Sequence, residues 1–190
     1  MSTINNTREL TRREFFEQYV IKDSEELVDT KPYHTFLVLL VAVEMLGKML
    51  LGETNEKGKS KRAFVEAIND IDALSPYRQF NHERTNYLYE LRCGMAHSLS
   101  LTNNVTLSLA PDKNDLSNGV IGCRDFLEDI KKAWNDVQNR DDLNVNLDEK
   151  VLFVNNSITG GSAASRVRVR VRPGLWPAHW TAWMYSIACS

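Results

Sequence analysis

The segment from Phe36 to Leu51, FLVLLVAVEMLGKMLL, limits the fold more than any other part of this 190-residue chain. It carries two charged residues, Glu44 and Lys48, and its uninterrupted apolar run ends at Val43. A membrane-spanning helix needs about 20 predominantly apolar residues, so we interpret the segment as a buried helix and expect no membrane association. Because it is apolar on almost every side, it should be the central helix of a domain.

Apolar residues at helical spacing predict further helices on both sides of this one. The expected helices cover residues 7–22, 32–51, 62–72, 81 or 83 to 96, and 124–138. The alternation in residues 99–110, around Asn103-Asn104, predicts a small hairpin-like insert. The run VLFV predicts a short strand within residues 143–154. The sequence therefore predicts an all-α domain over residues 1–158 with a small hairpin-like insert.

Residues 159–190 differ in composition from the rest of the chain. A Gly/Ser/Ala-rich stretch predicts a flexible linker, and RVRVRVRP and three tryptophans, Trp176, Trp180 and Trp183, follow it. We expect a flexible basic-aromatic tail, in which the Arg/Val alternation is typical of a solvated segment or an edge strand. Two origins stay open: a genuine tail of the protein, or a translated vector or frameshifted extension.

Composition and cysteine usage indicate a soluble protein of the cytoplasm. The apolar fraction is 43% and the charged fraction 25%, as in globular domains. A net charge of −2 argues against nucleic-acid binding through overall charge, although a local basic site remains open. Cys93, Cys123 and Cys189 are widely spaced, which predicts neither a zinc site nor a disulfide framework. We expect no metal and no cofactor, and the polar N-terminus does not resemble a signal peptide.

Arg92 and His97, near the end of an expected helix, are the candidate catalytic residues. An arginine can hold a phosphate and stabilise its developing charge, and a histidine can transfer a proton near neutral pH. Together they suit RNA cleavage without a metal. Five positions of an ideal helix turn through about 140°, so one helix would not place both side chains on one face. They need a helix end at His97 or a second subunit to work together.

The segment from Tyr87 to Leu99, YLYELRCGMAHSL, resembles the motif of the HEPN superfamily, in which an arginine is followed after four to six residues by a histidine. The sequence from Val43 to Gly47 is similar to the helix that packs beside this motif in bacterial members. The resemblance covers roughly residues 7–138. It implies a four- to five-helix bundle that forms a homodimer, with the two Arg/His pairs facing each other in a cleft.

The same resemblance implies a metal-independent endoribonuclease with Arg92 and His97 as catalytic residues. Such enzymes act on RNA in toxin–antitoxin, abortive-infection or CRISPR-linked systems, so an antitoxin or another defence protein is an expected partner. Other members are inactive and bind a protein or a nucleotide. Active members often carry a polar residue directly after the arginine, and this chain has Cys93 there. Cys93 therefore favours the inactive alternative.

Glu44 is, with Cys93, a residue expected to support the catalytic pair. An ionised group on an apolar helix needs a partner. The candidate partners are Lys48, Arg92 or another basic residue. The contact could be a structural ion pair, or it could orient Arg92 at the site. A third interpretation makes the motif accidental, because basic groups at the C-terminal end of a helix are favourable in themselves.

Overall fold

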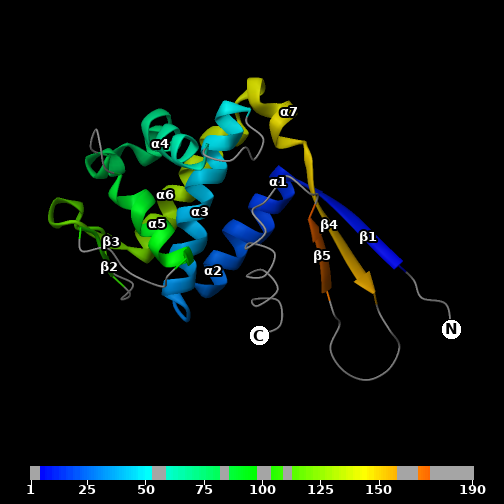
Figure 1. Cartoon of the computed structure of the whole chain (residues 1–190), viewed down its shortest axis with the longest axis horizontal. Coiled ribbons are helices and arrows are strands. Elements are labelled where there is room, and N and C mark those ends of the chain that lie inside the picture. Colours follow the sequence, from blue (N-terminus) through cyan, green and yellow to red (C-terminus); the bar gives the residue numbers. More distant parts are fainter. Residues whose placement is uncertain are drawn as a thin grey trace.

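The computed structural model of the chain describes residues 5–52, 59–81, 86–97, 104–108, 113–157 and 167–171 (Figure 1). The α-helices are α1 (Arg12–Phe15), α2 (Asp23–Leu27), α3 (Pro32–Leu51), α4 (Ser60–Asp70), α5 (Tyr87–His97), α6 (Cys123–Gln138) and α7 (Asn144–Leu147). A π-helix, η1 (Phe16–Lys22), and three 3-10 helices, η2 (Asp72–Phe80), η3 (Leu116–Asn118) and η4 (Asp141–Leu143), lie between them. The strands are β1 (Asn5–Thr11), β2 (Thr106–Ser108), β3 (Val120–Gly122), β4 (Lys150–Ser157) and β5 (Val167–Val171). The described residues are mostly helical, which confirms the predicted all-α class at the level of secondary structure.

Helix α3 lies at the centre of the helical body, as predicted, and contacts α2, α4, α5 and α6 (Figure 1). It begins at Pro32, a residue that is well suited to the first turn because its fixed φ fits a helix and its missing N–H is not needed there. It ends at Gly52, whose φ of 60° is left-handed and therefore favours glycine. Both predicted bounds of this helix are confirmed.

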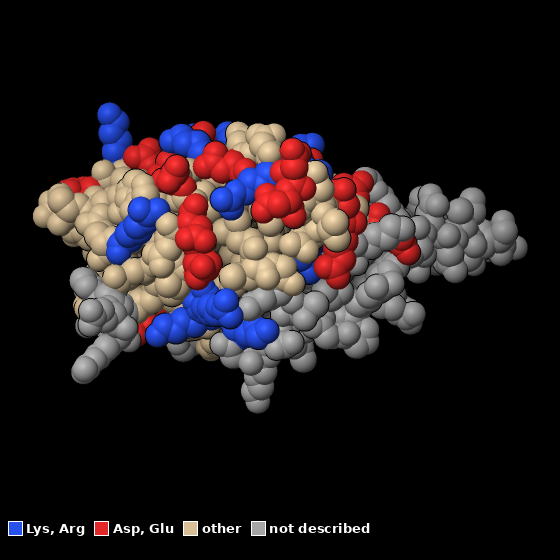
Figure 2. Space-filling model, turned by 90° about the horizontal axis from the view of Figure 1, so that it is seen from above, with Lys and Arg blue, Asp and Glu red and all other residues tan. Residues whose placement is uncertain are grey.

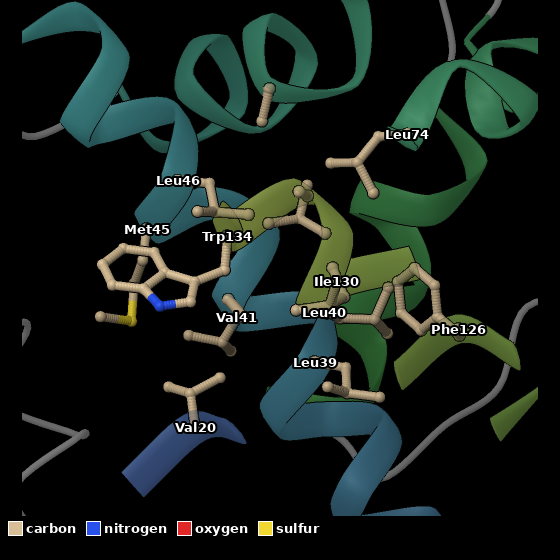
Figure 3. Packing of buried hydrophobic residues seen from close by; sticks show 14 of the residues in the cluster. Val20, Leu39, Leu40, Val41, Met45, Leu46, Leu74, Phe126, Ile130 and Trp134 are labelled. Carbon is tan, nitrogen blue, oxygen red and sulfur yellow. The ribbon is translucent and has the colours of Figure 1, made fainter. Parts of the chain in front are cut away.

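The core packs around α3, with α4 and α6 among the helices that cover it. Figure 3 shows the indole of Trp134 beside Met45, and Phe126 and Ile130 on the side of Leu40. By length and composition α3 could cross a membrane, but 67% of its most apolar window is buried inside the protein. Its apolar character is therefore accounted for by this packing.

The predicted helix over residues 7–22 is wrong at its start, because Asn5–Thr11 forms strand β1. Thr11 ends the strand and caps α1. Its hydroxyl accepts a hydrogen bond from the Glu14 backbone N–H at 3.1 Å, while the Glu14 carboxylate accepts one from the Thr11 backbone N–H at 2.9 Å. This capping box fixes where the helix can begin. Leu10, which falls within the predicted helix, lies in the strand and is buried.

Of the other predicted helices, two form within two residues of their expected bounds, whereas the third begins at Tyr87, later than its predicted start at residue 81 or 83. Helix α4 covers Ser60–Asp70, α5 covers Tyr87–His97 and α6 covers Cys123–Gln138. The chain continues from α4 into the 3-10 helix η2, which contains Pro76. Proline removes a backbone donor and so disfavours a continuing α-helix. The shift from α-helix to 3-10 helix thus takes place at Ile71, before the proline.

Three antiparallel strands form a sheet in the order β1-β4-β5, and the sheet extends from the α1 end of the helical body (Figure 1). Strand β4 contains the predicted VLFV run, with Leu152 opposite Leu10 of β1 and Val171 of β5. Strand β5 lies within residues 159–190, in the run whose Arg/Val alternation is typical of a solvated segment or an edge strand. The Arg/Val alternation fits the edge-strand interpretation. Residues 158–166 and 172–190 lie outside the described residues.

The predicted hairpin over residues 99–110 is only partly described, because 99–103 and 109–110 lie outside the described ranges. Within residues 99–110, Thr106–Ser108 forms strand β2. This strand pairs in parallel with β3, and Thr106 lies opposite Val120. Parallel pairing requires a connection longer than a hairpin turn, and residues 109–119 provide it. In the described part of the chain, β2 therefore pairs with a later segment.

Candidate functional site

Helix α5 carries both candidate catalytic residues and begins with a capped first turn. The Asn86 side-chain oxygen accepts a hydrogen bond from the Tyr89 backbone N–H at 2.7 Å, the arrangement of an N-terminal helix cap. Leu88, Leu91 and Met95 are at most 1% exposed and anchor the inner face of the helix. The position of Arg92 on the same helix is therefore fixed by capping and by core packing.

Arg92 and His97 occupy different environments on α5. Arg92 is 6% exposed, whereas His97 is exposed and is the last residue of the helix. The helix continues through Gly94, so the two Cβ directions differ by about 140°. The expected helix end at His97 is present, yet within one chain α5 directs the two residues to different faces.

Glu44 contacts both expected partners inside the protein. Its Oε2 lies 2.7 Å from Arg92 NH2, and its Oε1 lies 2.6 Å from Lys48 Nζ. The side chains of Glu44 and Arg92 are 6% and 7% exposed, and the Lys48 side chain is 17% exposed. The contact between Glu44 and Arg92 joins α3 to α5, and both interpretations given for Glu44, structural and orienting, require it.

The contact between the Arg92 guanidinium and Glu44 is an ion pair without an aligned hydrogen bond. The short contact between Arg92 NH2 and Glu44 Oε2 lacks hydrogen-bond alignment, and Arg92 Nε is buried without a hydrogen-bond partner in the described part of the chain. A buried donor left unpaired costs about 1–3 kcal/mol. Arg92 therefore keeps unused hydrogen-bonding capacity inside the protein.

The ionised form of Glu44 is favoured despite its burial. Burial alone would raise the pKa of this carboxyl, but the charges of Arg92 and Lys48, together with hydrogen bonds from Lys48 and Ser60, bring the pKa below its ordinary value. The carboxylate is therefore charged at neutral pH. It balances one of the two positive charges in contact with it.

Cys93 lies half-buried beside this group of charges. Tyr89, one turn earlier on α5, forms a side-chain hydrogen bond with Cys93. Burial and the neighbouring Cys93 raise the pKa of the Tyr89 hydroxyl to about 12, so Tyr89 stays protonated at neutral pH. The Tyr89 ring packs edge-on against Phe64 of α4 at 5.6 Å between ring centroids.

Helix α4 forms a third side of the site, which the sequence did not predict. A Cβ atom on Gly47 would lie 1.7 Å from the Ala63 carbonyl oxygen, so α3 and α4 cross with their backbones in close contact. Ser60, the first residue of α4, forms a hydrogen bond to Glu44. No local pattern around Ser60 indicates this role, because the contact depends on how α4 crosses α3.

Neither the face seen in Figure 2 nor the metal-binding side chains of the described residues give a second candidate. On the face seen in Figure 2, basic and acidic side chains are interspersed and form no extended basic surface. Over the described ranges, His, Cys, Asp and Glu side chains form no group of three that could hold a metal ion. The group around Glu44 thus brings together three of the predicted site residues, Glu44, Arg92 and Cys93, whereas His97 lies on a different face of α5.

No protein-family model matches the sequence, and comparisons with curated proteins and with solved structures found no similar protein. The functional evidence for this chain therefore lies in the residues around Glu44 and Arg92.

Proposed function

We propose that this protein is a metal-independent endoribonuclease of the HEPN type, which acts as a homodimer in the cytoplasm, in bacterial defence or a toxin system. The observation that carries the proposal is the buried contact between Glu44 and Arg92. It joins the two helices that carry the resemblance to the family. It also holds the arginine in one orientation on the helix that ends at His97.

A second subunit supplies the geometry that one helix does not provide. Arg92 and His97 point about 140° apart around α5, so a site that uses both draws them from two copies related by a two-fold axis. His97 is exposed at the end of α5, where another copy can approach it. Each dimer would then contain two equivalent sites.

The chemistry assigned to the two residues is transesterification of RNA. His97 accepts the proton of a 2′-hydroxyl, whose oxygen attacks the neighbouring phosphorus while the bond to the 5′-oxygen breaks. The leaving oxygen takes up a proton, which gives a 2′,3′-cyclic phosphate and a 5′-hydroxyl. Arg92 stabilises the charge that develops on the phosphate. A guanidinium has five N–H donors, so the contact of Glu44 with NH2 leaves others for this purpose.

Cleavage of a mixed RNA pool in excess EDTA tests the proposal. The purified protein should produce fragments with cyclic phosphate ends, and His97→Ala should abolish their formation. His34→Ala is the matched control, since His34 is also an exposed histidine but lies in the first turn of α3. Undiminished cleavage by the His97→Ala protein would rule out this mechanism.

A catalytically inactive HEPN module that binds a protein or nucleotide partner, such as an antitoxin, is the second candidate. Two observations favour it: Arg92 is 6% exposed, and Cys93 stands where active members often carry a polar residue. This alternative predicts a stable dimer and binding of labelled nucleotide or partner protein without cleavage. Turnover that depends on His97 would exclude it.

A further inference from the structure

Helix α4 contacts both helices that carry the buried ion pair. It crosses α3 where Gly47 meets the Ala63 carbonyl oxygen, with no room for a Cβ atom. It also meets α5, where Phe64 packs edge-on against Tyr89. The position of α4 is therefore defined relative to α3 and α5 together.

Ser60 lies one turn before Ala63, just as Glu44 lies one turn before Gly47. The Ser60 side chain forms a hydrogen bond with the Glu44 carboxylate, which also contacts Lys48 and Arg92. Lys48 belongs to the same helix as Glu44, four residues further on. The hydrogen bond from Ser60 is therefore the contact that ties the Glu44 carboxylate to α4.

Helix capping does not account for this serine. The N-cap residue of α4 is Lys59, and no side chain caps the helix there. Ser60 is the first residue inside the helix, and its hydroxyl is directed to Glu44. A serine that acted only at the helix end would bond to a backbone N–H of the first turn.

We propose that Ser60 is a positioning residue, which fixes the Glu44 carboxylate and through it the orientation of the Arg92 guanidinium. A glutamate side chain has three rotatable bonds, and contacts from α3 alone leave its carboxylate several orientations. The hydrogen bond from α4 selects the orientation in which Oε2 meets Arg92. The inference rests on the proposed function for its effect on catalysis, but the orientation of Arg92 can be measured without any activity.

The test is the reaction of Arg92 with phenylglyoxal, which modifies accessible guanidinium groups, followed by peptide mass spectrometry. Arg124, whose side chain is 47% exposed, serves as the internal reference. Ser60→Ala should raise the modification rate of Arg92 several-fold, and Ser60→Thr, which keeps the hydroxyl, should restore the slow rate. Ser75→Ala removes another half-buried serine and should leave the rate unchanged. Ser60→Cys, which keeps the volume but weakens the donor, replaces Ser60→Ala if that protein is unstable.

The outcomes separate this inference from the proposed function. An Arg92 rate in folded Ser60→Ala equal to that of the parent would overturn the positioning role. A faster Arg92 reaction in Ser60→Ala, with rescue by Ser60→Thr, supports the role even if no RNA is cleaved, in which case the proposed function alone fails. If RNA is cleaved, Ser60→Ala should lower kcat more than it changes KM, because a misoriented guanidinium loses contacts to the transition state.

Discussion

Glu44 of α3 and Arg92 of α5 form a buried ion pair, with 2.7 Å between Oε2 and NH2. Both side chains are almost entirely removed from water, so each depends on the other to compensate for its lost hydration. The pair also joins the two segments on which the resemblance to HEPN proteins is based. Its energetics and its proposed role at a catalytic site can be tested separately.

Removing one partner of the pair should destabilise the protein strongly. Glu44→Ala leaves a buried, uncompensated guanidinium and should cost about 3–5 kcal/mol of unfolding free energy. The double variant Glu44→Leu with Arg92→Met replaces both charges by apolar groups and should cost less than Glu44→Ala alone. Urea denaturation measures both values, with Glu66→Ala on α4 as the control. A double variant less stable than the single one would contradict this account.

The stability of the fold should depend on the charge of Glu44 in acid. The folded-state pKa of this carboxyl lies below the ordinary value of 4.5, so its contribution is complete above that value. The contribution is lost as the pH falls through the lower, folded-state pKa. Unfolding free energies between pH 6 and pH 3, about the range in which carboxylates titrate, should fall less steeply for Glu44→Gln than for the parent. Glu66→Gln removes a carboxylate outside the ion pair and should flatten the slope less.

Gly47→Ala should destabilise the protein through the contact between α3 and α4. The new methyl group would meet the Ala63 carbonyl oxygen at 1.7 Å, and a backbone atom moves only with its helix. Overpacking of this kind costs about 1–3 kcal/mol, and occasionally more. Thermal unfolding should show the loss, whereas Lys61→Ala, at an exposed position of α4, should change little. Equal stability of the Gly47→Ala protein would mean that the two helices can separate without cost.

The sequence predicted helix α3 well because its signals are local. Its apolar run, Pro32 at the start and Gly52 at the end act within the segment itself. Strand β1 was missed, although the capping box formed by Thr11 and Glu14 was readable in the sequence. The pairing of residues 5–11 with residues 150–157 joins segments that lie far apart in the sequence, and no local pattern encodes such a register.

The same distinction holds for the candidate site. The contact between Glu44 and Arg92 could be anticipated, because a charge on an apolar helix requires a partner. The participation of Ser60 could not, since it depends on the angle at which α4 crosses α3 beside Gly47. The relation between Arg92 and His97 follows from helix geometry alone. Under the proposed function the two residues meet across two chains, and the sequence of one chain does not specify that contact.

A heterodimer of two different variants tests whether the sites are built from two chains. One chain carries Arg92→Lys, which keeps the charge but loses bidentate phosphate binding, and the other carries His97→Ala. Co-expression with two affinity tags and purification by both tags isolates this heterodimer. If each site takes Arg92 from one chain and His97 from the other, one of the two sites keeps both native residues. Activity should then be about half that of the parent.

Each homodimeric variant is the control for this experiment, because every one of its sites lacks a native residue in either arrangement. If both residues of a site came from one chain, the heterodimer would also contain no complete site. Its activity would then be no higher than that of the two homodimers. Recovery in the heterodimer therefore requires Arg92 and His97 of different subunits to act on the same RNA phosphate.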